Sequence, residues 1–320
     1  MSKALVLIEH DRGTMSEMAP QALGLARSLD LDVEAVVIGE EAGPLAARLA
    51  ELGISRVHVV HHAVLTDFAP EAWGEALAQL IVATGARVAL TTGTDRGNEV
   101  MAHVAAIVDQ PMVANVTQAE PGETWHITRI RWGGSLLEEA ELDADMHLLT
   151  VAPHSWSAPE AVPGAGEPTV DRFEPTLDES AARTRVVDRV TLSAGITLAT
   201  APVVVGGGRG VGSAEGFEPL EELAGLLGGV VGCSRVVTNS GWRPHTDQVG
   251  QTGTRIAPDL YIACGISGAI QHWVGAMASK KILAINTDAD ANMMQKADYA
   301  VVGDLHEIVP ALITSLKSRG

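Results

Sequence analysis

Short apolar runs alternate with longer stretches of helical periodicity through the first half of the 320-residue chain. The apolar runs at 4–8, 33–38, 57–60 and 88–92 predict buried strands, and the stretches at 19–29, 44–52, 69–84 and 98–108 predict helices. Strands that alternate with helices in this way pair in parallel through crossover connections. The pattern therefore predicts a doubly wound, mostly parallel α/β sheet of the nucleotide-binding type.

The pattern becomes less regular after this alternation. Residues 125–131 and 146–151 predict further strands, with a break at Gly133 and Gly134 between them. Residues 153–185 contain five prolines separated by glycine and glutamate, which is typical of a linker or a surface crossing without a packed core. An apolar pattern returns over 183–196 but predicts no definite element. We therefore assign residues 1–200 to a first α/β domain.

The second half repeats one unit, which consists of a strand, a glycine turn and a helix. Residues 201–205, 206–212 and 218–227 form the first copy, and residues 259–264, 265–268 and 269–279 form the second. Apolar runs at 230–233, 281–285 and 299–302 predict the remaining strands of a Rossmann-like second domain at 201–320. In the second helix, Ile270, Val274 and Met277 are spaced to share one face.

A glycine turn between a buried strand and a helix leaves backbone N–H groups at the edge of the sheet. These groups and the positive end of the helix dipole suit a phosphate, and open α/β sheets hold ligands at this edge. In the first domain, residues 91–97 also join a strand to a helix. That loop either binds a ligand or only caps the helix, and the sequence leaves both interpretations open.

The composition narrows the class of protein. A net charge of −18 and the lack of a basic run argue against partners such as nucleic acid or an anionic membrane surface. A hydrophobic content of 46% is enough for two cores, and two cysteines fit a reducing compartment. The sequence starts without a signal-peptide pattern and has no apolar segment of about 20 residues, so we expect a cytoplasmic protein without direct membrane insertion.

The residues that usually carry nucleophilic or metal chemistry are not arranged in a recognisable pattern. The eleven histidines are scattered and have no carboxylates at metal-ligand spacing. The chain has no G-x-S-x-G elbow, no P-loop lysine and no C-x-x-C pair. Cys233 and Cys264 lie in apolar, strand-like runs, so we expect both to be small buried hydrophobic side chains.

Polar residues gather instead at the predicted carboxyl ends of the second-domain strands. They are Arg209, Ser234, Arg235, Gln248, Gln251, Thr252, Ser267, Gln271, His272, Asn286 and Asp304. Each has a simpler interpretation: Arg235 as a surface cation, His272 as a satisfied core histidine, residues 248–253 as a turn and Asp304 as a helix cap. Together they describe a site for a large anionic dinucleotide, with chemistry that belongs to a bound cofactor.

The stretch from Val204 to Pro310 resembles the flavin domain of the electron transfer flavoprotein alpha subunits. The main signature is LYIACGISGAIQH at 260–272. It is supported by GGRG at 207–210, SR at 234–235, QVGQTG at 248–253, AIN at 284–286, ADY at 297–299 and DL at 304–305. The first half resembles the family more loosely, through residues 8–10 and the loop at 91–93.

The resemblance implies that the second domain binds one FAD and no metal, and that no catalytic residue belongs to the chain itself. The implied cofactor-binding residues are Arg209, Gly210, Ser234, Arg235, Gln248, Gly250, Gln251, Thr252, Gly265, Ser267, Gly268, Ala269, Ile270, Gln271, His272, Asn286, Asp304 and Leu305. The last three are expected around the adenosine. A guanidinium at Arg235 and a hydrogen-bond donor at His272 would stabilise an anionic flavin semiquinone, and a hydroxyl at Thr252 would lie near N5.

The resemblance also implies an electron carrier rather than an enzyme. The carrier would pair with a beta subunit that holds AMP, and it would accept electrons from flavin dehydrogenases such as acyl-CoA dehydrogenases. It would pass these electrons to a membrane quinone oxidoreductase. Two alternatives are a flavin-bifurcating, NADH-oxidising relative and a non-redox dinucleotide-binding protein of similar fold.

Overall fold

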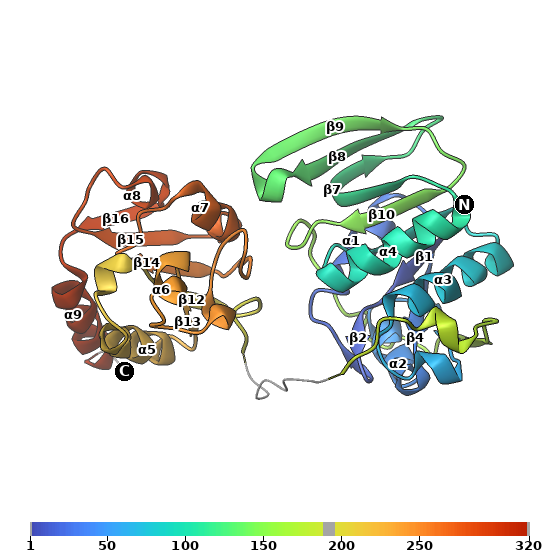
Figure 1. Ribbon diagram of the computed structural model, residues 1–320, viewed down its shortest axis with the longest axis horizontal. Helices are drawn as coiled ribbons and strands as arrows, with labels where there is room; N and C mark the ends of the chain where they lie inside the picture. Colours follow the sequence, from blue (N-terminus) through green and yellow to red (C-terminus); the bar gives the residue numbers. More distant parts are fainter. Residues whose placement is uncertain (1, 188–195, 319–320) are drawn as a thin grey trace. The chain divides into compact units, whose positions relative to one another are not determined.

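The computed structural model describes residues 2–187 and 196–318, which form two compact units (Figure 1). The first unit comprises Met1–Arg131 and Leu136–Thr191, and the second comprises Trp132–Ser135 and Leu192–Gly320. Part of the apolar stretch at 183–196, for which we predicted no definite element, lies outside the described residues. Each unit is built on a sheet of its own.

Nine strands form the large sheet of the first unit. In spatial order they are β11 (Thr169–Phe173), β5 (Arg56–Val60), β4 (Asp32–Ile38), β1 (Lys3–Leu7), β6 (Val88–Thr92), β10 (His147–Val151), β7 (Met112–Glu120), β8 (Trp125–Arg131) and β9 (Leu136–Leu142). Neighbours from β11 to β7 pair in parallel, and β8 and β9 extend the sheet as an antiparallel hairpin. The predicted doubly wound, mostly parallel sheet is confirmed.

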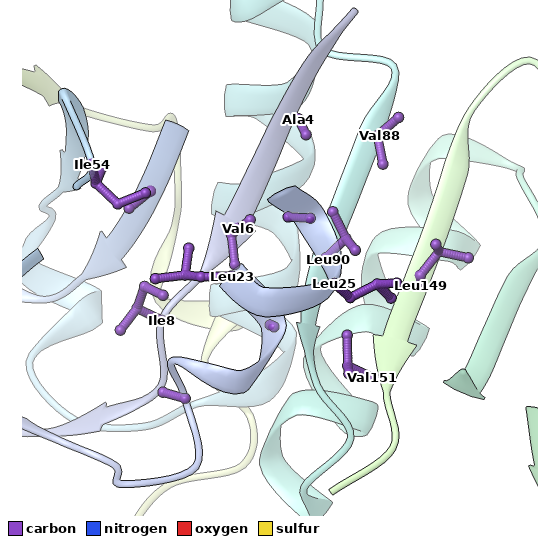
Figure 2. Packing of buried hydrophobic residues seen from close by; sticks show 14 of the residues in the cluster. Ala4, Val6, Ile8, Leu23, Leu25, Ile54, Val88, Leu90, Leu149 and Val151 are labelled. Atoms are coloured by element: carbon purple, nitrogen blue, oxygen red, sulfur yellow. The ribbon is translucent and has the colours of Figure 1, made fainter. Parts of the chain in front are cut away.

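Helices cover both faces of this sheet and create two hydrophobic cores. They are α1 (Gln21–Ser28), α2 (Leu45–Glu51), α3 (Pro70–Thr84) and α4 (Asp95–Val108). Side chains alternate along β1, so Val6 packs with α1 and α2 while Leu5 packs with α3 and α4. Figure 2 shows the first of these cores, in which Leu25 of α1 lies among residues of the central strands such as Leu90 and Leu149.

One prediction for the first unit was wrong. Within the proline-containing segment, β11 pairs in register with β5, where Val170 lies opposite Val57. Asp171 forms an ion pair with Arg56, and Phe173 packs against the core. This strand was not predicted because its sequence, TVDRF, lacks the continuous apolar run of a central parallel strand. An edge strand does not need such a run. Strands β7 and β9 were also not predicted, because polar residues interrupt their apolar patterns.

Five strands form the parallel sheet of the second unit. In spatial order they are β13 (Val230–Cys233), β12 (Val203–Gly207), β14 (Leu260–Cys264), β15 (Ile282–Asn286) and β16 (Tyr299–Val302). The helices are α5 (Glu218–Leu226), α6 (Arg235–Asn239), α7 (Ile270–Ala276), α8 (Asn292–Lys296) and α9 (Leu305–Lys317). Residues of α5 and α9 share one core, and residues of α7 and α8 share the other (Figure 1). The predicted Rossmann-like α/β architecture is confirmed.

The three apolar residues predicted to share one face of the helix at α7 are not all buried. Ile270 and Met277 are 55% and 50% exposed, and the buried residues of α7 are His272, Val274, Gly275 and Ala276. Small residues decide the face, since a Cβ at Gly275 would lie 2.3 Å from the Cα of Gly250. A seven-residue helix is too short for apolar spacing to fix its orientation.

None of the helices in the described part of the chain has the length and hydropathy needed to cross a bilayer.

Candidate functional site

Two glycine turns meet at the carboxyl ends of β12 and β14. β13 lies on one side of β12 and β14 on the other, so this edge is the topological switch point of the sheet. The Gly208 N–H donates to the Cys264 carbonyl at 2.9 Å, and the Gly210 N–H donates to the Gly265 carbonyl at 3.2 Å. A Cβ at Gly208 would lie 2.2 Å from the Gly265 oxygen, so the two backbones approach this closely only because glycine has no side chain.

The turn at 265–268 is held in one shape by α8. Gly268 has a φ of 75°, and a Cβ there would lie 2.4 Å from the backbone nitrogen of Met293. That nitrogen donates to the Ser267 carbonyl at 3.2 Å. Among the described residues, the N–H groups of Ser267, Gly268 and Ala269 make no hydrogen bond. They are therefore available to an anion bound at this edge.

A pocket of about 530 Å³ opens at the switch point and joins the ends of four strands. It brings together the predicted site residues Arg209, Gly210, Ser234, Arg235, Gly265, Ser267, Gly268, Ala269, Gln271, His272 and Asn286. Its volume falls in the range of pockets that enclose much of a cofactor-sized ligand. The arrangement supports the prediction that these separate motifs face one ligand.

The charges in the pocket suit an anion. Arg209 and Arg235 are exposed, and neither guanidinium forms an ion pair or hydrogen bond with another described residue. Arg243, which lies in the same unit but outside the pocket, binds Glu221 and Asp247 instead. In a chain with a net charge of −18, two guanidinium groups and three backbone N–H groups that have no partner among the described residues suit the phosphates of a ligand.

His272 is both a core residue and a pocket residue. The imidazole is buried, and its Nε2 lies 2.8 Å from the hydroxyl of Tyr261. Burial lowers the pKa of His272 to about 4, although the backbone of Val249 partly opposes this effect. Within the described residues, no group completes a hydrogen bond of normal geometry to Nδ1. The side chain is therefore neutral at pH 7, and its Nε2 is the ring nitrogen that is hydrogen-bonded.

The predicted residues at 248–252 form a loop beside the pocket and do not line it. The buried Gln248 accepts from Thr238 and donates from Nε2 to the Thr252 hydroxyl, both at 2.9 Å. The Gln251 N–H donates to the Gln271 carbonyl at 2.8 Å, and the backbone of Gly250 packs against α7. The segment forms a turn, and this turn is tied to the start of α7.

Three further predicted residues lie outside the pocket lining. Ile270 is exposed on α7. Asp304 caps α9, where its carboxylate accepts from the His306 N–H at 2.9 Å, as its simpler interpretation predicted. Leu305 is buried in the core of α5 and α9 and limits the space at Gly265, where a Cβ would lie 2.8 Å from the leucine Cδ2.

The prediction missed five residues that line the pocket, namely Val236, Asn239, Ile266, Asp288 and Ala291. Asn239 follows Arg235 by one turn of α6, and helical spacing would have found it once that short helix was recognised. Asp288 follows the end of β15, where a carboxylate after a buried strand was a usable signal.

The loop at 91–97 in the first unit is explained as a helix cap. The Thr94 hydroxyl accepts from the Gly97 N–H at 2.9 Å, and the Thr91 hydroxyl donates to the Leu7 carbonyl at 3.0 Å. The Asn98 amide donates to the Gly93 carbonyl at 3.1 Å. These bonds show that the loop caps the start of α4.

The two cysteines lie in the core beneath the pocket edge, as predicted. Cys233 and Cys264 are both free and fully buried, and burial raises the pKa of each thiol to about 12. Within the described part of the chain, no group of three or more His, Cys, Asp or Glu residues is placed to hold a metal ion.

Comparison with known proteins assigns both halves of the chain to one kind of protein. Residues 197–277 match the electron transfer flavoprotein FAD-binding domain family, and residues 4–178 match the electron transfer flavoprotein domain family. The electron transfer flavoprotein subunit alpha of Mycobacterium tuberculosis strain CDC 1551 is 36% identical over 100% of this chain and 99% of its own length. That of Bacillus subtilis strain 168 is 32% identical over 98% of this chain and 97% of its own length. A probable mitochondrial electron transfer flavoprotein subunit alpha of Caenorhabditis elegans is 36% identical over 99% and 94%.

Proposed function

The chain belongs to the electron transfer flavoprotein alpha subunits, and from this we propose that the pocket of its second unit holds the FAD through which the protein carries electrons. An alpha subunit implies a beta subunit as its partner. The single observation that carries the proposal is the pocket at the switch point, where guanidinium groups and backbone N–H groups without partners among the described residues converge.

The geometry of this pocket supports FAD as its ligand. The N–H groups at 267–269 and the guanidinium of Arg209 suit the diphosphate. Arg235, at the end of β13, suits the electron-accepting ring, because a cation there stabilises added negative charge. His272 adjoins the loop at 248–252, so a ring bound beside His272 would also reach Gln248 and Thr252.

The partners of the electron transfer are proposed from family membership. We assign flavin dehydrogenases such as acyl-CoA dehydrogenases as donors, as in fatty acid oxidation, and a membrane quinone oxidoreductase as acceptor. The beta subunit is proposed to hold AMP. When bound, FAD supplies the redox chemistry, and the residues of this chain bind it, orient it and set the charge around it.

The test is to purify the chain together with its beta subunit and to measure the visible spectrum, the flavin content and the nucleotide content. We expect one FAD and one AMP per heterodimer, and reduction of the flavin by an acyl-CoA substrate only when its dehydrogenase is present. A heterodimer that stays free of flavin when FAD is supplied would contradict the proposal. Two flavins and no AMP would favour the bifurcating, NADH-oxidising alternative, and reduction by NADH alone would support it further.

A further inference from the structure

Asp288 differs in charge from its neighbours in the pocket. Among the described residues that line the pocket, it is the only carboxylate, whereas Arg209 and Arg235 are cations. It follows β15, the strand beside β14, and so lies on the side of the pocket opposite β13. A carboxylate repels phosphate, so a ligand with a diphosphate would turn an uncharged, hydrogen-bond-donating part toward Asp288.

The position of Asp288 is fixed by hydrogen bonds to the glycine turn. The Asn286 side chain donates from Nδ2 to the Ile266 carbonyl at 3.2 Å and accepts at Oδ1 from the Asp288 N–H at 3.1 Å. The Asp290 N–H then donates to Oδ1 of Asp288 at 3.0 Å. Each end of the Asn286 amide makes one of these bonds, so Asn286 holds Asp288 against the turn.

One oxygen of Asp288 remains available. In the described part of the chain, Oδ1 receives the Asp290 N–H and Oδ2 receives no hydrogen bond. An ionised carboxylate only accepts hydrogen bonds, so the matching group on a ligand is a neutral donor such as a hydroxyl. The two hydroxyls of a ribose are such donors.

The order of elements around Asp288 repeats that of dinucleotide-binding folds. β14, the turn at 265–268, α7 and β15 follow one another, and Asp288 comes after the second strand. In folds of this topology, an acidic residue at that place accepts hydrogen bonds from the ribose of the adenosine half. The same residue type at the same topological position points to the same contact here.

We propose that Asp288 accepts hydrogen bonds from the ribose hydroxyls of the adenosine half of the dinucleotide, the half that the family resemblance places beside Asn286. This inference rests on the proposed function, because it takes FAD as the ligand. The flavin then lies on the Arg235 side of the pocket. Asp288 is thus a specificity residue for FAD against flavins that lack adenosine, and Asn286 is the residue that positions it.

The test is a competition between FAD and riboflavin 5′-phosphate for the purified heterodimer, followed by measurement of the bound flavins after gel filtration. Both flavins carry the ring and a phosphate, but only FAD carries the adenosine ribose. We expect Asp288→Ala to lower the preference for FAD over riboflavin 5′-phosphate by roughly tenfold or more, which corresponds to the loss of hydrogen bonds to a charged group.

Asp290→Asn is the matched control. It changes a carboxylate in the same loop but keeps the backbone N–H that binds Asp288, so it should leave the preference unchanged. An unchanged preference in Asp288→Ala would overturn the inference, and so would an equal loss in Asp290→Asn. A wild-type heterodimer that binds no FAD would instead contradict the proposed function, so the two failures are distinguishable.

Discussion

The hydroxyl of Tyr261 lies 2.8 Å from Nε2 of His272, and both side chains are buried. The Tyr261 hydroxyl fits because residue 206 is glycine. A Cβ at Gly206 would lie 2.3 Å from the hydroxyl oxygen of Tyr261. The pair links a central strand to the helix that follows the glycine turn. The imidazole is thereby kept in an environment that favours its neutral form.

This burial predicts a pH dependence of stability. The pKa of His272 is about 4 in the folded protein, below its unfolded value near 6.5. Between these pH values the unfolded chain binds a proton that the native protein does not, so stability falls as the pH decreases. The expected loss from pH 6.5 to 4 is about 3 kcal/mol.

Thermal unfolding of the heterodimer at several pH values would measure this loss. His272→Gln should lose less stability than the wild type over the same range, because glutamine does not titrate. His306→Gln, which changes an exposed histidine of the same unit, should follow the wild-type profile. Parallel curves for the wild type and His272→Gln would contradict the prediction.

Replacing Arg235 should weaken flavin binding without weakening the fold. Its guanidinium lines the pocket and has no partner among the described residues. We expect Arg235→Ala to raise the Kd for FAD by roughly tenfold and to lower the midpoint potential of the bound flavin, since a cation near the ring is lost. Flavin fluorescence and a redox titration would measure the two effects.

Arg243→Ala is the complementary variant. Arg243 bonds to Glu221 and Asp247, and its guanidinium lies 5.4 Å from the centre of the Phe217 ring. Its loss should lower the thermal midpoint by roughly 4 °C and leave the FAD affinity unchanged. Equal effects of the two substitutions on FAD affinity would argue against a specific role for Arg235.

Gly268 should tolerate no side chain. Its φ of 75° and the 2.4 Å distance that would separate an added Cβ from the Met293 nitrogen both oppose alanine. We expect Gly268→Ala to lower the free energy of unfolding by at least about 2 kcal/mol and to reduce the amount of bound FAD.

Gly225→Ala is the control, because Gly225 lies in α5 with no atom within 4 Å of the added Cβ. It should be neutral or stabilise the protein by about 0.5–1 kcal/mol. A Gly268→Ala protein as stable as Gly225→Ala would contradict this account.

The cysteines should be unreactive in the native protein. Cys233 and Cys264 both lie in register with Gly207, so β12 separates them. Two strand spacings amount to about 10 Å, which is too far for a disulfide. Because the pKa of each thiol is raised to about 12, very little thiolate exists at pH 8. A thiol-reactive dye should label neither residue in the native state and both after denaturation. Rapid labelling of either native cysteine would overturn this prediction.

Local sequence patterns determined most of the elements that position the site. The continuous apolar runs of β1, β6, β12 and β14 identify central parallel strands, because both of their faces are covered. The glycine turns at 206–212 and 265–268 identify the edge of the sheet where the pocket opens, because only glycine fits at positions such as 208 and 268. The motif at 260–272, read with the motifs around it, identified the family.

Tertiary structure alone decided the features that depend on contacts between distant residues. β11 was not predicted because it is an edge strand with many polar residues. Only its pairing with β5 identifies it as a strand. The spacing of apolar residues did not determine which face of α7 is buried, because Gly275 and Gly250, which are distant in sequence, set how the helix packs. Asp288 had a sequence signal, as a carboxylate after a buried strand, but its place in the pocket followed only from the pairing of β15 with β14. Sequence determines local conformation through backbone and apolar patterns, whereas the pairing of distant segments requires the folded chain.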